Sequence, residues 1–417
     1  MIKNYPFPKK RWVAPVLGIY LFFLAWLSRD SQGGLYLLSF YKAQFLSCLL
    51  SCLVGLAWLG CNRKNWGQIL KDGRGILTLA FCLTLLIPVL ARRDWQMMYI
   101  SILYCILVAM LLSYFTNVRE LSRVFVAMMA VLSLVSLVCT YVLRIPADRG
   151  VLVPPVFQNS FQAEFYNYFL CFVSRTFAKE RNFGIFREPG VYQFFLFLAL
   201  YLNNYYLNWR RESHMWMVNA LLVVTMLSTF ASGGVAVTAV FLVALYFDKK
   251  VYKTKPGKIF TAVFLAMATV AGLWLVIRKP PLYVQLKLMV LKFFIPNPSL
   301  DDRVESIRFN LHALSFRPFL GREISYLLEM VAHNTSSTTL LLGCQGIVFG
   351  WLNLVGWLVL VLRGKGGLVM KGGSFLMLAA TFNCENLVTN PYLWIFSLLA
   401  LTEALLPKLY KLLYKKD

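Results

Sequence analysis

The chain has 417 residues, of which 59% are hydrophobic and 14% are charged, and its formal net charge is +24. With a mean hydropathy of +0.64, this composition excludes an ordinary soluble globular protein. Apolar runs of roughly 17–25 residues recur along the chain, and this length crosses a bilayer as a helix. Most basic residues lie between these runs. The positive charge therefore indicates membrane topology and not binding to nucleic acid.

In chain order, the runs predict about twelve transmembrane helices. The fold class is thus an all-α polytopic membrane protein, with residues 1–417 forming one transmembrane domain. The runs are continuous rather than alternating, which favours helices over the strands of a membrane barrel. The predicted spans are 12–28, 36–60, 75–91, 96–116, 124–143, 189–208, 215–231, 233–247, 258–277, 338–362, 374–388 and 391–407.

One alternating set of short connectors is rich in lysine and arginine, and the other set holds few. Cytoplasmic loops carry this excess, so we expect both termini in the cytoplasm. The basic start of the chain precedes a long apolar run without a small-residue cleavage site, which predicts a first anchor. Two long segments, 144–188 and 278–337, then fall on the extracytoplasmic side. The basic connectors contain Lys9, Lys10, Arg11, Arg63, Lys64, Lys71, Arg74, Arg119, Arg123, Arg210, Arg211, 249–258, 363–371 and 408–416.

The first long segment ends with charged residues directly before an apolar run. Arg181, Arg187 and Glu188 precede Pro189 in the stretch RNFGIFREPGVYQFFLFL. A guanidinium keeps its charge and binds phosphate through paired hydrogen bonds. This arrangement predicts a site at the membrane surface, although a local ion pair between Arg187 and Glu188 would also explain it.

The second long segment contains a predicted helix that follows Pro296 and Pro298. Arg303, Ile307, Asn310 and Leu314 share one face of it, whereas Arg308 points about 140° away from Arg303. The two arginines therefore cannot both enter one small site, although a broad anionic substrate could span them. Pairing of Arg303 with acids on its own helix is the alternative. Upstream, 280–294 suggests either a helix on the membrane interface or a plain linker.

Two further polar elements stand at the ends of predicted spans. His333 and Asn334 precede one run; the histidine is either a base near neutral pH or a capping residue. Glu385 lies among asparagines before Pro391, which predicts either a polar patch facing a cavity or a packing network. Of the nine cysteines, Cys171 alone falls in an expected external loop, without an evident partner, and no metal-ligand spacing is present.

Three stretches resemble the bacterial O-antigen polymerase and O-antigen ligase family of membrane glycosyltransferases. They are GIFREPGVYQFFLFL, DDRVESIRFNLHALSFRPFLG and HNTSSTTLLLGCQGIVFGWL. The family often carries an aromatic residue four positions after the arginine of the second stretch, where this chain has Ile307. The resemblance implies an inverting, metal-independent and cofactor-free polymerase of the bacterial cytoplasmic membrane. Its partners would be undecaprenyl-diphosphate-linked glycan, membrane lipids and a chain-length regulator protein.

The chemistry of diphosphate departure assigns roles to these residues. The leaving group needs stabilisation of developing negative charge, which fixed cations provide where water is excluded. Arg187 and Arg303 are the predicted catalytic cations, and His333 orients or deprotonates the attacking hydroxyl. The predicted substrate-binding residues are Arg181, Glu188, Arg308, Asn334 and Glu385. A ligase for a final acceptor would use nearly the same residues, whereas a lipid-linked oligosaccharide transporter would carry charges through its spans and broken helices near the midplane.

Overall fold

The computed structural model describes residues 10–70, 72–160, 162–176, 178–253, 298–331 and 334–414. Helices make up 75% of the structure. Within the described ranges, six helical segments are long and apolar enough to cross a membrane: Phe40–Cys61, Gly73–Arg92, Met97–Phe115, Val118–Asp148, Ser337–Arg363 and Pro391–Lys411. The prediction of a helical, membrane-embedded protein is therefore confirmed at this level.

A helix covers most of each predicted span that lies in the described residues, although the helix Leu368–Phe382 leaves 383–388 of the predicted span 374–388 outside any helix. These helices are α1 (Lys10–Trp26), α2 (Phe40–Cys61), α4 (Gly73–Arg92), α5 (Met97–Phe115), α6 (Val118–Val138), α8 (Pro189–Tyr205), α9 (Glu212–Ser228), α10 (Ser232–Asp248), α15 (Ser337–Arg363), α16 (Leu368–Phe382) and α17 (Pro391–Tyr414). Several have only 15 to 17 residues. The predicted span 258–277 and the predicted interfacial helix 280–294 lie outside the described residues, so twelve spans remain a prediction.

Shorter elements connect these helices. Two π-helical turns, η1 (Gly33–Leu37) and η3 (Cys139–Leu143), adjoin α2 and α6. The other short elements are η2 (Arg63–Asn65), α3 (Trp66–Leu70), α7 (Arg144–Asp148), η4 (Val251–Lys253), α13 (Pro298–Phe316) and α14 (Ile324–Met330). Polar caps set some of the boundaries, since Asp72 accepts a hydrogen bond from the backbone N–H of Arg74 at the start of α4.

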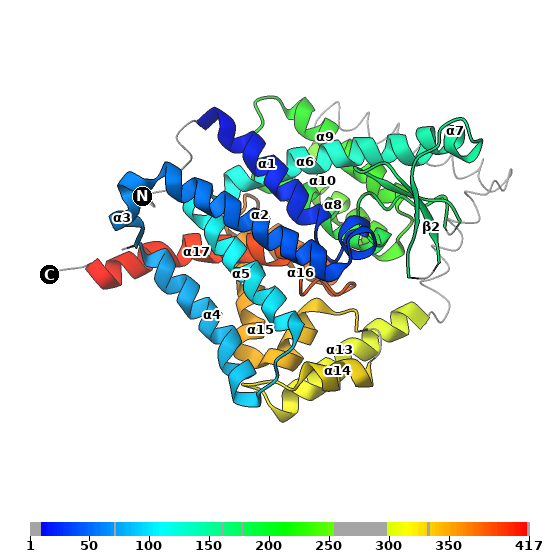
Figure 1. Cartoon of the computed structure of the whole chain (residues 1–417). Coiled ribbons are helices and arrows are strands. Elements are labelled where there is room, and N and C mark those ends of the chain that lie inside the picture. Colours follow the sequence, from blue (N-terminus) through cyan, green and yellow to red (C-terminus); the bar gives the residue numbers. More distant parts are fainter. Residues whose placement is uncertain are drawn as a thin grey trace.

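The two ends of the helical bundle differ. The start of α1 and the end of α17 lie at one end, and α7, the strands and α13 lie toward the other (Figure 1). The link after α1 and the link before α17 meet at this second end, where Asn390 Nδ2 donates to Asp30 Oδ2 over 2.8 Å. The residues before α8 join them there. Three links from distant parts of the sequence thus lie next to one another at this end.

Helix α8 is the central helix of the bundle. Every residue of α8 except Gly190 is buried, and the helix packs against α6, α9, α10 and α16. Phe194 and Phe195 both contribute to the aromatic core, with ring centroids 5.3 Å apart. The apolar run that follows Arg187 therefore faces protein rather than lipid. Its hydrophobicity reflects burial on all sides of the helix.

A three-stranded antiparallel sheet occupies the first long segment, for which the sequence predicted no strands. Its strands are β1 (Val156–Gln158), β2 (Glu164–Asn167) and β3 (Phe172–Ser174), in the order β1-β2-β3. Phe157 of β1 pairs with Phe165 of β2 in the ladder, and their rings stack at 5.6 Å. Strands of three or four residues are too short for an alternation of apolar and polar residues to stand out.

Helix α15 is interrupted at Gly346, whose backbone has φ +71° and ψ −176°. The turn after α13 enters the interruption, where the N–H of Ile347 donates to the oxygen of Pro318 over 2.7 Å. A Cβ at Gly346 would collide with the backbone oxygen of Phe319, and one at Gly321 would collide with the backbone of Cys344. Both glycines are thus required where two chain segments approach closely.

Candidate functional site

Arg187 is held by the extended residues that precede α8. Its backbone N–H donates to the oxygen of Asp30 over 2.8 Å, and Gln32 Nε2 donates to the oxygen of Arg187 over 3.0 Å. The preceding Phe186 is buried, with its ring centroid 4.3 Å from that of Phe195. Pro189 then begins α8, a position where a missing N–H costs nothing. Packing and backbone hydrogen bonds together fix the position of the Arg187 backbone, from which the guanidinium extends.

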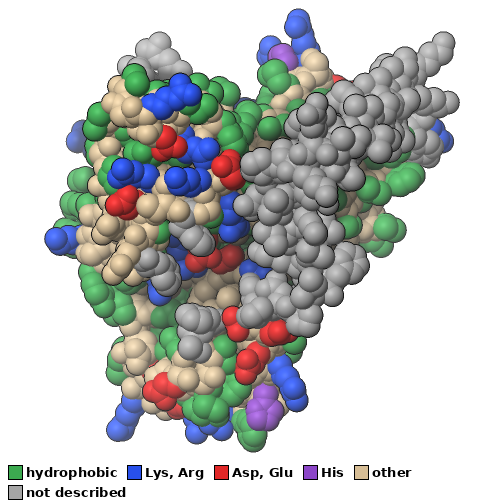
Figure 2. Space-filling model, turned by 90° about the vertical axis from the view of Figure 1, so that its right-hand side faces the viewer, with side chains coloured by type: hydrophobic (Ala, Val, Ile, Leu, Met, Phe, Trp, Pro, Cys, Tyr) green, Lys and Arg blue, Asp and Glu red, His purple; other side chains and the backbone are tan. Residues whose placement is uncertain are grey.

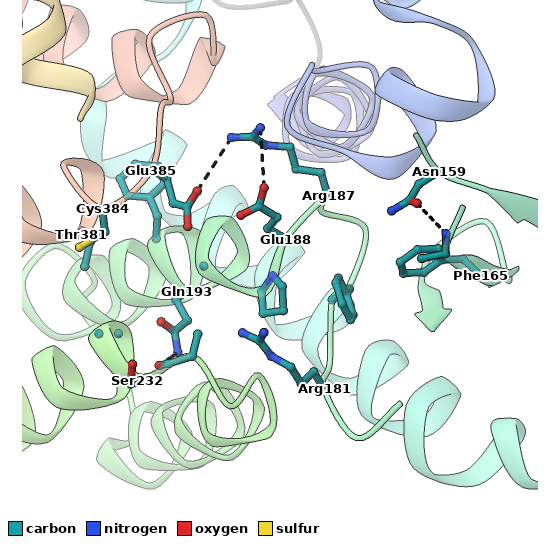
Figure 3. A pocket seen from close by; sticks show the side chains of 18 of the residues that line it. Asn159, Phe165, Arg181, Arg187, Glu188, Gln193, Ser232, Thr381, Cys384 and Glu385 are labelled. Carbon is teal, nitrogen blue, oxygen red and sulfur yellow. Dashed lines mark hydrogen bonds and ion pairs between the residues drawn. The ribbon is translucent and has the colours of Figure 1, made fainter. Parts of the chain in front are cut away.

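Three carboxylates surround the Arg187 side chain. Its nitrogens lie 3.2 Å from Asp30, 3.9 Å from Glu188 and 3.9 Å from Glu385, and Figure 3 shows the guanidinium between the two glutamates. Burial opposes the charge of Arg187, but these carboxylates raise its pKa. Burial raises the pKa of Asp30, and the attraction of Arg187 only partly offsets that effect. The arginine is therefore a fixed cation.

Arg303 reaches the same place from α13. Its Nε donates to the backbone oxygen of Cys384 over 3.2 Å, and its Nη2 lies 3.9 Å from Glu385 Oε1. Arg187 lies at the same distance from the other oxygen, Glu385 Oε2. The structure thus brings the two predicted cations to opposite oxygens of one carboxyl group. The pairing of Arg303 with Glu385 comes from another segment and not from its own helix.

Glu385 sits in the link between α16 and α17, with a side chain that is 9% exposed. Ser337 Oγ donates to the backbone oxygen of Glu385 over 2.6 Å. A Cβ at Gly190 would collide with Glu385 Oε1, so the present position of the carboxyl depends on the glycine in the first turn of α8. Burial, together with the nearby Glu188, raises the pKa of Glu385 to about 8 despite the attraction of the two arginines. The carboxyl can therefore exchange its proton near neutral pH.

These charged groups line a cavity of about 730 Å³. Figure 2 looks onto this end of the molecule, where acidic and basic side chains gather at the centre of the face. The lining combines charged groups with amides and aromatic rings. The lining includes Tyr36, Asn159, Gln162, Phe165, Arg181, Phe183, Arg187, Glu188, Gly190, Gln193, Ser232, Gly233, Gly234, Arg303, Thr381, Cys384 and Glu385.

The other predicted site residues divide into three groups. Arg181 lines the cavity, and its Nε donates to the oxygen of Thr229 over 3.0 Å. Asn334 is buried and exchanges hydrogen bonds with Asn310 of α13 at 2.8 and 3.1 Å, so it does not line the cavity. Arg308, which we predicted to bind substrate, is exposed and is not among the lining residues, because it points away from the Arg303 face of the helix. His333 lies outside the described residues.

Sequence patterns missed several residues that build the site. Asp30 is the closest charged partner of Arg187, and its only sequence signal is an acid placed directly after the first apolar run. The asparagines around Glu385 are not among the residues that line the cavity. Asn383 serves packing instead, since it accepts from the N–H of Thr338 over 2.9 Å. Ser232, Gly233 and Gly234, at the start of α10, also line the cavity.

No group of three or more His, Cys, Asp or Glu residues in the described part of the chain is arranged to hold a metal ion. The fold and the site together define a helical membrane protein with a charged cavity at one end of its bundle. No family model matches the chain, and no match was found among the curated proteins or the solved structures.

Proposed function

We propose that the protein is a bacterial membrane glycosyltransferase that polymerises oligosaccharide repeat units carried on undecaprenyl diphosphate, as O-antigen polymerases do. The observation that carries this proposal is the meeting of Arg187 and Arg303 at Glu385 inside one cavity. Fixed guanidinium groups suit a diphosphate. A volume of about 730 Å³ is typical of a ligand site and would admit the diphosphate with adjoining sugar.

In the proposed reaction, a sugar hydroxyl of the acceptor attacks the anomeric carbon of the donor. A glycosidic C–O bond forms while the bond from that carbon to the diphosphate oxygen breaks. Undecaprenyl diphosphate leaves with the bonding electrons, and the hydroxyl proton passes to a base. Arg187 and Arg303 stabilise the charge that develops on the leaving oxygen. His333 remains the assigned base, and the adjacent Asn334 is tied to α13 through Asn310.

Glu385 has a defined part in this scheme. In its ionised form it offsets the charge of both arginines, at 3.9 Å from each. A diphosphate brings its own negative charge to the same guanidinium groups, which makes an ionised Glu385 unfavourable. Because its pKa is raised to about 8, the carboxyl is largely protonated near neutral pH, and a bound phosphate favours this neutral form further. The arginines are then released to the substrate without leaving a buried, unpaired carboxylate.

The uncharged side chains that line the cavity suit the glycan. Asn159, Gln162 and Gln193 carry amide groups, and Phe165 and Phe183 carry apolar rings. Amides both donate and accept hydrogen bonds, as sugar hydroxyls require. Aromatic rings offer flat apolar surfaces for the C–H faces of a sugar ring. Charged groups for the diphosphate and neutral groups for the sugars thus face one space.

The proposed topology has twelve transmembrane helices, cytoplasmic termini and two long extracytoplasmic loops, 144–188 and 278–337. The asymmetry of basic residues in the short connectors supports this orientation. The cavity is lined by residues of the strand-bearing segment, the start of α8 and the link before α17. The strands lie away from the start of α1 and the end of α17 (Figure 1). The active site would therefore face the outside of the bacterial cytoplasmic membrane.

One structural feature also bears on the transporter alternative. Helix α15 is interrupted at Gly346, and interrupted membrane helices are common in transporters. Here the backbone of Phe319 fills the gap, and Gly346 is not among the residues that line the cavity. The interruption therefore supports a packing role and does not favour transport.

The test is a reconstituted assay with purified protein and carrier-linked repeat units as the only glycan substrate. We expect the wild-type protein to extend the chains, whereas a ligase would leave them unchanged. Arg303→Ala should lower the rate by about 100-fold or more. Arg308→Ala, on the exposed face of the same helix, is the matched control and should stay within a few-fold of wild type. Equal rates for the two variants, or no extension by the wild-type protein, would overturn the proposal.

A further inference from the structure

Two cysteines from different segments meet beside the sheet. Cys139 is the first residue of η3, at the end of α6, and Cys171 directly precedes β3. Both side chains are buried, with 4% and 0% of their surfaces exposed. Both are free thiols in this structure, and they lie in the same small buried cluster. The sequence offered Cys171 no partner because Cys139 falls within an apolar run.

The surroundings of the pair are apolar and tightly organised. Cys139 and Cys171 form a separate small core with Ala147, Tyr166 and Val173. The backbone near Cys171 is fixed by the N–H of Tyr168, which donates to the oxygen of Cys171 over 3.0 Å. The thiols are thus held together by the fold itself. Neither belongs to a group of residues that could hold a metal ion.

The side of the membrane on which the two cysteines lie determines whether they can be oxidised. Helix α7 and the sheet, which flank Cys139 and Cys171, lie away from the start of α1 and the end of α17 (Figure 1). In the proposed topology, on which this inference rests, that end is extracytoplasmic. Disulfides form and persist in that compartment, whereas cytosolic thiols stay reduced.

We propose that Cys139 and Cys171 form a disulfide bond that ties the sheet-bearing loop to α6. The bond forms by exchange with the disulfide of an extracytoplasmic thiol oxidant. One cysteine thiolate attacks the donor disulfide, the second displaces the donor from the mixed disulfide, and the donor leaves as a dithiol. The exchange precedes closure of the small core, because both thiols are buried afterwards.

The bond has a consequence for the candidate site. The cross-linked cysteines enclose α7 and strands β1 and β2, and the chain continues from Cys171 through β3 to Arg181 and Arg187. Closing this loop removes freedom from the unfolded chain. The disulfide therefore stabilises the segment that supplies one wall of the cavity, although neither sulfur lines the cavity itself.

The test counts thiols and maps the cross-link in full-length protein taken from bacterial membranes. The sample is denatured without reductant and treated with a maleimide reagent, before and after reduction. We expect two fewer thiols than the nine cysteines to react before reduction. Mass spectrometry should find the peptides of Cys139 and Cys171 joined, and Cys171→Ser should make Cys139 reactive. Cys52→Ser, which removes an exposed thiol on α2, is the control that should keep the cross-link.

Reductant should also lower the thermal midpoint of the wild-type protein by several degrees and leave that of the double variant Cys139→Ser/Cys171→Ser unchanged. The inference is overturned if all nine thiols react without reductant while another envelope protein in the same membranes keeps its disulfide. If all nine thiols react but chain extension still depends on Arg303, the proposed function stands and only the disulfide inference is rejected.

Discussion

Asp30 and Arg187 are joined twice, once through their backbones and once through their side chains. The N–H of Arg187 donates to the oxygen of Asp30 over 2.8 Å, and the side-chain nitrogen and oxygen lie 3.2 Å apart. Asn390 also donates to the other carboxylate oxygen of Asp30 over 2.8 Å. The link after α1 and the links before α8 and α17 therefore position one guanidinium together.

Replacing Asp30 should damage both stability and activity. Asp30→Ala leaves Arg187 mostly buried without its closest carboxylate, a change that typically costs about 3–5 kcal/mol. The double variant Asp30→Ala/Arg187→Met should lose less stability than the two single effects added together, because it leaves no unpaired charge. Thermal or chemical unfolding in detergent measures the stability of the wild type, the two single variants and the double variant, which together form a double-mutant cycle. Purely additive effects would show that the two side chains do not stabilise each other.

Glu385 should make stability depend on pH. Its pKa is raised in the folded protein to about 8, so the folded state holds this proton more tightly than the unfolded state does. This group therefore adds to the free energy of unfolding below about pH 4.5, and its contribution is lost as the pH rises toward 8. The loss is at most about 1.4 kcal/mol per pH unit. Glu385→Gln should flatten part of this slope. The neighbouring Asp30, whose pKa is also raised, should contribute to the slope that is left. Parallel stability curves for wild type and Glu385→Gln between pH 5 and 8 would contradict the assignment.

Gly190→Ala should disturb the site through a single added methyl group. The new Cβ would collide with Glu385 Oε1 and force that carboxyl away from the arginines. We expect the rate of chain extension to fall at least about 10-fold, since small misplacements in a catalytic site carry large costs. Gly372→Ala on α16 is the matched control, because nothing lies within 4 Å of its added Cβ. A normal rate for Gly190→Ala would show that the position of Glu385 is unimportant.

Gly346→Ala should destabilise the protein without touching the cavity. The residue has φ +71°, and its Cβ would meet the backbone oxygen of Phe319. A strained backbone costs about 1–3 kcal/mol, and the collision adds to this. The expected result is a lower midpoint of unfolding in detergent. A midpoint equal to that of wild type would mean that the turn after α13 does not occupy the interruption of α15.

The pattern of Arg303 and Arg308 was predictable because helical geometry is local. Residues four apart share a face, so Arg303, Ile307, Asn310 and Leu314 were expected together. The structure buries Asn310 on that side and leaves Arg308 exposed. The positions of the long helices were likewise predictable, because continuous apolar runs of the right length have few other structures available in a membrane.

The sequence by itself determined that this protein is a helical membrane protein and where its helices lie, since hydropathy and helical period are local properties. Only the tertiary structure decided that α8 is central, that Asp30 and Glu385 hold Arg187 and Arg303, and that Cys139 lies beside Cys171. These relationships join residues that are far apart in the chain. Pairing of distant groups depends on how the helices pack, and no local pattern of residues specifies that packing.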